Sequence, residues 1–125
     1  MPQQYVDVYC DGPRGGRVKE EEELIEYVEI ACSLLKIKQA DINIIVYNKF
    51  PKDEISADWL GCCYGSLDEG ITIELTRDQE DMYQTLAHEM IHVEQFLDGR
   101  YPSEREAKRR EFDLHKKVKE LCTLT

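Results

Sequence analysis

The run His88-Glu89-Met90-Ile91-His92 limits what this chain can fold into more than any other feature of it. Apolar residues recur at steps of three and four on both sides of the run, which predicts an amphipathic helix. Residues four apart project from the same face of a helix, so both imidazoles can reach one metal ion. Catalytic zinc sites usually take three protein ligands and leave one position open, so the fold must bring a further ligand to this helix.

Glu89 follows the first histidine and leans towards the open coordination position. A carboxylate there can take a proton from water on the metal. Zinc lowers the pKa of bound water from about 15.7 towards 7, so hydroxide forms at neutral pH. We therefore expect a zinc cofactor, with His88 and His92 as ligands and Glu89 as the general base. The opposing interpretations are two surface histidines without a metal, or a structural zinc site, which has no need of a base at Glu89.

The rest of the pattern predicts a single domain over residues 1–125 with an α+β fold. Hydrophobic residues make up 42% of the chain and charged residues 34%, which excludes wholesale disorder. Thr76 and Gln79 have the spacing of a capping box, with Asp78 as an alternative cap, and Gly99 is placed to end the same helix. We expect three helices on a small antiparallel or mixed sheet of about three to four strands. The expected strands cover residues 5–9, 42–47, 59–64 and 71–75, and the expected helices cover residues 19–35, 76–99 and 102–121.

A third metal ligand is expected on the last helix, where two glutamates lie on or beside the apolar face. If the last two helices form a tight antiparallel hairpin, Glu111 lies level with the two histidines. Glu104 then lies roughly two turns lower, about 10 Å away at 1.5 Å per residue, unless the loop climbs back. Glu111 is therefore the preferred ligand and Glu104 the alternative. Asp98 would need the pattern HExxHxxGxxH, whose glycine is replaced here by Gln95.

These residues resemble the gluzincins, in which HExxH is followed by a helix that carries a glutamate ligand. The run from Leu86 to Val93 looks especially like small minigluzincin-type and SprT-like proteins, many of them encoded by phages. The similarity covers residues 42–121; it is specific in the HExxH run and pattern-level elsewhere. It implies a zincin-like fold and zinc-dependent hydrolysis of peptide bonds in a peptide or protein substrate.

The resemblance also implies roles for residues outside the HExxH run. The Glu-x-x-Ala step of the family matches Glu104, whereas thermolysin-like spacing matches Glu111, so this criterion leaves both open. The acidic or amide residue often found four positions later is Lys108 or His115, and the cysteine zinc ribbon of SprT-like proteases is absent. Tyr101 and His115 are candidate donors to the oxyanion of the reaction. Substrate is expected to lie antiparallel to an edge strand formed by residues 71–75, with contacts from Ile71, Thr72 and Ile73.

Charge and cysteine content narrow the expected partners and location. The net charge of −10 argues against nucleic acid as the main partner, because affinity for phosphate comes from Lys and Arg. The last helix is locally basic, and we expect it to pair with the glutamate-rich first helix; a silent binding module with an acidic or nucleic-acid partner is the alternative. No apolar run approaches the roughly 20 residues that span a bilayer. Without a secretory pattern at the N-terminus or a CxxC pair among the five cysteines, we expect a cytoplasmic protein with reduced thiols.

Overall fold

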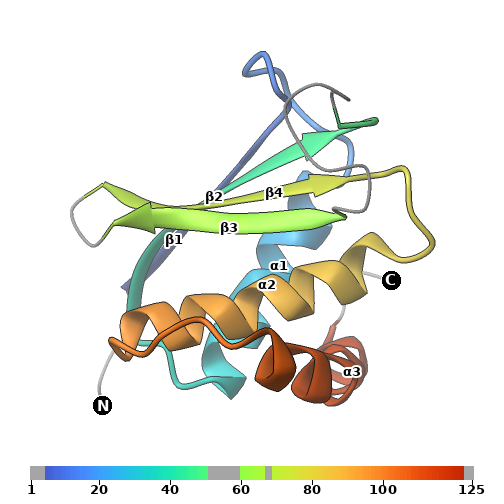
Figure 1. The fold of residues 1–125 in the computed structure, drawn as a ribbon. Coiled ribbons are helices and arrows are strands. Elements are labelled where there is room, and N and C mark those ends of the chain that lie inside the picture. The colour runs from blue at the N-terminus through green and yellow to red at the C-terminus, as the bar shows by residue number, and fades with distance from the viewer. Residues whose placement is uncertain (1–4, 51–59, 67–68, 123–125) are drawn as a thin grey trace.

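The computed structural model describes residues 5–50, 60–66 and 69–122. Four strands form a mixed sheet, and three helices pack against one of its faces (Figure 1). The expected α+β layout is therefore confirmed, although residue 59 of one expected strand lies outside the described residues. In chain order the elements are β1 (Tyr5–Asp11), α1 (Glu21–Leu34), β2 (Gln39–Tyr47), β3 (Gly61–Ser66), β4 (Gly70–Thr76), α2 (Met82–Leu97) and α3 (Glu104–Leu121).

The strand order β1-β2-β4-β3 corrects one prediction about the substrate-binding strand. β4 pairs in parallel with β2 and antiparallel with β3, so residues 71–75 form an inner strand and their assignment as an edge strand is wrong. The side chains of Ile71, Ile73 and Leu75 are buried, which suits a strand flanked on both sides. Thr72 lies between them, on the other face of the sheet. The edge strand of this hairpin is β3, which contains two glycines.

The hydrophobic core lies between the sheet and the helices. In β2, alternate residues are buried, as expected for a strand with one face covered and the other open. The amphipathic face of α1 packs against the same layer. Within the described ranges, no helix is long and apolar enough to cross a membrane. Fully buried core side chains include Leu24, Tyr27, Val28, Ile42, Ile44, Val46, Ile73, Leu75, Leu86, Met90 and Ile91.

The ends of α2 are set by one acidic residue and one glycine. Asp81 is the N-cap, and its carboxylate accepts from the main-chain N–H groups of the second and third helical residues. The predicted caps Thr76, Gln79 and Asp78 are therefore wrong. Thr76 instead ends β4, where its hydroxyl donates to the carbonyl of Asn48. Gly99 follows the helix with a φ of 72°, a conformation that favours glycine, so the predicted end of α2 is confirmed.

Helix α3 contacts both of the other helices. Arg110 of α3 pairs with Glu94 of α2 at 2.6 Å. One link from α3 to α1 is a hydrogen bond of 2.7 Å from the hydroxyl of Tyr27 to Nδ1 of His115. Nε2 of the same histidine contacts Asp81 at 3.1 Å, so His115 joins all three helices.

Candidate metal centre

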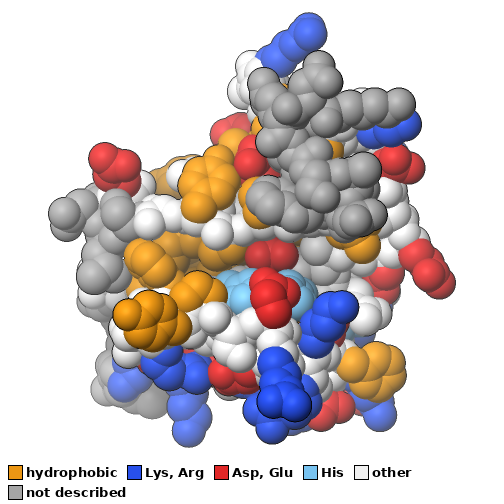
Figure 2. Space-filling view, viewed as in Figure 1, with side chains coloured by type: hydrophobic (Ala, Val, Ile, Leu, Met, Phe, Trp, Pro, Cys, Tyr) orange, Lys and Arg blue, Asp and Glu red, His pale blue; other side chains and the backbone are white. Residues whose placement is uncertain are grey.

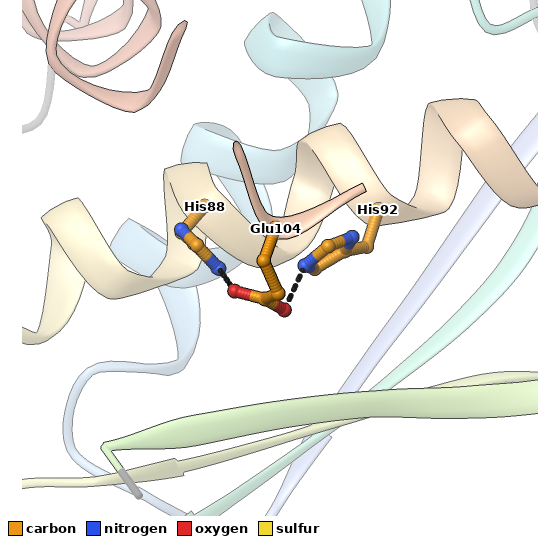
Figure 3. A group of neighbouring side chains, drawn as sticks. All are labelled: His88, His92 and Glu104. Atoms are coloured by element: carbon orange, nitrogen blue, oxygen red, sulfur yellow. Dashed lines mark hydrogen bonds and ion pairs between the residues drawn. The ribbon is translucent and has the colours of Figure 1, made fainter. Parts of the chain in front are cut away.

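The two histidines of the HExxH run project from the same face of α2, as their spacing predicts. Their ring centroids lie 4.9 Å apart. Both side chains are largely buried, at 13% exposure for His88 and 10% for His92. In each ring, Nε2 is directed towards the same point in front of the helix (Figure 3). The helix thus presents two nitrogen donors to one position.

Glu104 supplies the third group at this position. One of its carboxylate oxygens lies 3.0 Å from Nε2 of His88, and the other lies 2.7 Å from Nε2 of His92 (Figure 3). The three ligand atoms lie within 4.8 Å of one another. The structure therefore brings the alternative, Glu104, together with the two histidines, and the preferred residue, Glu111, lies outside this group.

The loop between α2 and α3 explains why Glu104 reaches the histidines. The tight-hairpin assumption placed Glu104 below the HExxH turn. Instead, residues 98–103 double back along α2: the N–H of Arg100 donates to the carbonyl of Gln95 at 2.9 Å. The Gln95 side chain then bonds the main chain of Ser103, which caps α3 by accepting from the N–H of Glu106. Because the loop climbs about two turns before α3 begins, the first residue of that helix is level with the two histidines.

Glu111 has a different place beside the same cluster. Its Oε1 lies 3.4 Å from Nδ1 of His88, the ring nitrogen that does not face Glu104. The amide of Gln84 donates to the other oxygen of Glu111 at 3.4 Å. Carboxylates that contact the outer nitrogen of a metal-binding histidine fix its tautomer and orientation. Glu111 is thus positioned to orient His88, and it lies outside the group of possible metal ligands.

Glu89 is buried beside the cluster, with 5% of its surface exposed. Burial raises the pKa of its carboxyl group to about 7, against the opposing effect of His88 and His92. The two neighbouring glutamates add to the increase. Glu104 behaves differently: burial opposes its ionisation, but the two imidazoles hold the pKa of its carboxyl group below its usual range. The two carboxylates therefore differ in environment as well as in position.

A groove of about 650 Å³ opens in front of the cluster. Figure 2 shows the histidine and acidic side chains gathered in a hollow between the sheet and the lower helices. One wall is β3, which lies close over α2: a Cβ atom added at Gly61 would lie 2.7 Å from Cγ2 of Thr85. The absent side chain at Gly61 thus lets the edge strand approach the helix that carries the histidines. Residues from Leu60 to Gly65 form this wall, and the facing wall includes His88, Glu89, His92, Phe96, Pro102, Glu104, Lys108 and Glu111.

The donor set of the cluster fits zinc. Two imidazole nitrogens and one carboxylate are typical protein ligands of a catalytic zinc ion, which keeps a fourth position open. Both imidazoles have a hydrogen-bond partner on their outer nitrogen: Glu111 for His88, and Gln95, at 2.9 Å, for His92. Outer partners of this kind are typical of metal-binding histidines. Within the described part of the chain, this is the one group whose geometry suits a metal ion.

Most of the residues predicted to bind substrate or to donate to the oxyanion do not line the groove. Ile71 lines it, whereas Ile73 is buried in the core and Thr72 faces the opposite side of the sheet. Tyr101 is 94% exposed and is not part of the groove wall, and His115 bonds elsewhere. Neither candidate oxyanion donor therefore lies at the cluster.

Sequence reasoning missed Gln95, although it left a signal. Gln95 lies on a buried side of α2, about one turn after Ile91, and apart from Glu89 the other buried residues of this helix are apolar. A polar side chain at a buried helix position needs hydrogen-bond partners, which marks it for attention. Its partners, His92 and Ser103, could not be identified without the path of the loop.

No family model, no curated protein and no solved structure matches this chain. The resemblance noted for the HExxH run thus rests on the residues of the chain itself. A fold alone does not determine an activity, so function has to be argued from the geometry of the cluster and its groove.

Proposed function

We propose that this chain is a zinc-dependent metallopeptidase. The observation that carries the proposal is the convergence of His88, His92 and Glu104 within 4.8 Å, beside the buried carboxylate of Glu89 and open to a groove. A structural zinc site is normally closed by four protein ligands and has no need of a neighbouring base. Three ligands, an open side and a carboxylate together favour hydrolysis over a silent binding module.

His88, His92 and Glu104 would hold the metal. When bound, zinc supplies a Lewis acid that lowers the pKa of water and polarises the carbonyl of the scissile bond. The carboxylate of Glu89 accepts a proton from water as the water oxygen bonds to the carbonyl carbon. When the C–N bond breaks, the same carboxyl group returns the proton to the leaving amine nitrogen. Glu89 thus acts first as base and then as acid.

We propose that substrate binds along β3. Among the described residues, β3 pairs only with β4, so its other edge is free to pair with an extended peptide. This edge borders the groove that contains Glu89 and Glu104. An added strand there, antiparallel to β3, would bring a backbone carbonyl to the cluster. The substrate class is therefore an extended segment of peptide or unfolded protein.

A cytoplasmic location is part of the proposal. All five cysteines are free thiols, and thiols persist in reducing compartments. The raised pKa values of buried thiols such as Cys32, about 12 because of burial, keep them protonated and unreactive. They serve as small apolar residues of the core rather than as catalytic groups.

The Glu89→Gln variant tests the proposal. It keeps the shape of the side chain and removes its ability to take a proton. We expect wild type and variant to bind one equivalent of zinc by elemental analysis, and cleavage of a fluorescently labelled unfolded protein to fall at least about 100-fold in the variant. Equal cleavage by both proteins would overturn the enzymatic role, and a wild type that binds no zinc would overturn the metal site.

A further inference from the structure

Gln95 is a fully buried polar side chain whose amide connects two of the candidate metal ligands. It has no exposed surface. Its Oε1 lies 2.9 Å from Nδ1 of His92 and accepts from the N–H of Ser103 at 3.0 Å. Its Nε2 donates to the carbonyl of Ser103 and to Oε1 of Glu106, each at 3.2 Å. Every hydrogen-bonding atom of the amide is therefore used.

These partners fix which end of the amide faces His92. A main-chain N–H can only donate, and a carbonyl or carboxylate oxygen can only accept. A flipped amide would bring two nitrogens together at the N–H of Ser103 and two oxygens together at its carbonyl and at Glu106. Oxygen must therefore face His92. Because this oxygen only accepts, Nδ1 of His92 carries a hydrogen, so Nε2, which faces Glu104 at 2.7 Å, is the nitrogen left to bind a metal.

The same amide also determines where α3 begins. Its paired bonds to the N–H and carbonyl of Ser103 hold this residue against α2, and the next residue in the chain is Glu104. The main-chain carbonyl of Gln95 adds a bond from Arg100. The loop of residues 98–103 is thus tied to Gln95 by main chain and side chain together. Without this tie, the spacing along the helices would bring Glu111 to the histidines instead.

We propose that Gln95 is the positioning residue of the metal centre: one buried amide holds the hydrogen on Nδ1 of His92 and positions Glu104 beside this ring. The inference rests on the proposed metal site. It predicts that a substitution at Gln95, which would contact neither metal nor substrate, affects two ligands from different helices, His92 and Glu104. Outer partners of metal ligands affect metal affinity by about 10–100-fold, so the effect is measurable.

Gln95→Met tests this, because methionine keeps the length and burial of the side chain but can neither donate to nor accept from these partners in the same way. We expect zinc affinity, measured by competition with a chromophoric chelator, to fall about 10–100-fold. In the metal-free protein, we expect the hydrogen on Nδ1 of His92 and the amide hydrogen of Ser103 to exchange faster with solvent. Zinc affinity within twofold of that of the Val93→Ala control, with unchanged exchange of the hydrogen on Nδ1 of His92, would overturn the proposal.

Val93→Ala is the matched control. Val93 is fully buried in the same helix, two residues earlier, and belongs to the hydrophobic core. The substitution should lower the free energy of unfolding by about 1–3 kcal/mol without changing zinc affinity of the folded protein. A fall in affinity equal to that of Gln95→Met would show that loss of stability alone explains both, which contradicts a positioning role.

Gln95→Glu separates the two tasks of the amide. A carboxylate still accepts from His92 and from the N–H of Ser103. Its second oxygen, however, faces the Ser103 carbonyl and Glu106, which are also acceptors, so these two hydrogen bonds are lost. We expect the hydrogen on Nδ1 of His92 to stay protected from exchange while the Ser103 amide exchanges faster, and zinc affinity to lie between those of wild type and Gln95→Met. Since these measurements use metal-free protein and zinc binding, an inactive wild type that still binds zinc would refute the proposed peptidase and leave the role of Gln95 supported.

Discussion

Oε1 of Glu111 lies 3.4 Å from Nδ1 of His88, on the side of the ring away from Glu104. Two glutamates on one helix thus approach one imidazole from its two nitrogens. In the proposed site the inner glutamate would bind the metal, and the outer one would fix the orientation of the ring. His92 has the same arrangement, with Glu104 inside and Gln95 outside. Each ligand histidine is therefore held between an inner and an outer partner.

This division of roles predicts different effects for the two glutamates. We expect Glu104→Ala to lower zinc affinity by more than about 100-fold, because a ligand is lost, and Glu111→Ala to lower it by about tenfold, because only the orientation of His88 is lost. Zinc content after dialysis, with affinity by chelator competition, checks both. The reverse order would return the ligand role to Glu111.

The close approach of β3 to α2 predicts a steric effect at Gly61. A Cβ atom there would lie 2.7 Å from Cγ2 of Thr85 and 3.1 Å from the carbonyl oxygen of Glu74. We expect Gly61→Ala to lower the free energy of unfolding by about 1–3 kcal/mol, measured by urea denaturation.

Two variants identify the cause of this effect. Thr85→Ser removes the clashing methyl group and keeps the hydroxyl that bonds Gln79, so the double variant with Gly61→Ala should recover part of the loss. Gly16→Ala is the control, since nothing lies within 4 Å of a Cβ atom there. No recovery in the double variant would show that contact with Thr85 is not the source of the strain.

An ion pair at the start of α1 predicts a pH dependence of stability. Arg77 contacts both carboxylate oxygens of Glu20 at 2.7 Å, and this hydrogen bonding holds the pKa of the Glu20 carboxyl group below its usual value of 4.5. Since the folded-state pKa is the lower one, the pair stabilises the fold above pH 4.5, and this contribution is lost as pH falls through the folded-state pKa. We expect Glu20→Gln to lower the free energy of unfolding by about 1–2 kcal/mol at pH 7, and the difference to shrink in acid.

The neighbouring pair provides the control for that measurement. Arg17 lies 3.6 Å from Glu21, and its side chain is 93% exposed. Glu21→Gln makes the same chemical change one residue later and should alter the free energy of unfolding by less than about 0.5 kcal/mol. Urea titrations at a series of pH values compare the two variants, and equal effects would contradict a specific role for Glu20.

The bond between Tyr27 and His115 predicts a loss of stability in Tyr27→Phe. Burial raises the pKa of the Tyr27 hydroxyl, so it stays protonated and donates to Nδ1 of His115 at 2.7 Å. Its removal leaves that nitrogen without its donor, which should lower the free energy of unfolding by about 1–3 kcal/mol in thermal or urea unfolding. Tyr83→Phe removes a hydroxyl that donates to Glu23 at the surface, and should have the smaller effect. A larger effect at Tyr83 would refute this explanation.

Much of the fold follows from periodicity in the sequence. The apolar spacing around His88 predicts α2, and Gly99 predicts its end, because helix geometry is local. The position of β4 within the sheet is not local: a hairpin can add to a sheet by either of its strands. The alternation of Ile71, Ile73 and Leu75, beside a glycine-rich β3, is the signal that favours β4 as the inner strand.

The candidate site shows the same division between local and long-range information. His88, Glu89 and His92 belong to one helix, so their relative positions follow from spacing alone. The choice between Glu104 and Glu111 depends on the loop that precedes them, and that loop is held by a side chain outside the motif. The hydrogen bonds of Gln95 therefore move the start of α3 by about two helical turns along α2. Residue spacing alone cannot predict this shift.

If the proposed site binds zinc, the exposed position of Glu104 has a consequence for how the protein takes up this ion. Its side chain is 73% exposed, and neither it nor the two histidines belongs to the hydrophobic core. Chelators should therefore strip zinc while helix content, followed by circular dichroism, stays constant, and added zinc should restore binding. Folding would then precede metal uptake, so the supply of zinc in the cell, rather than the folding yield, would set the number of active molecules.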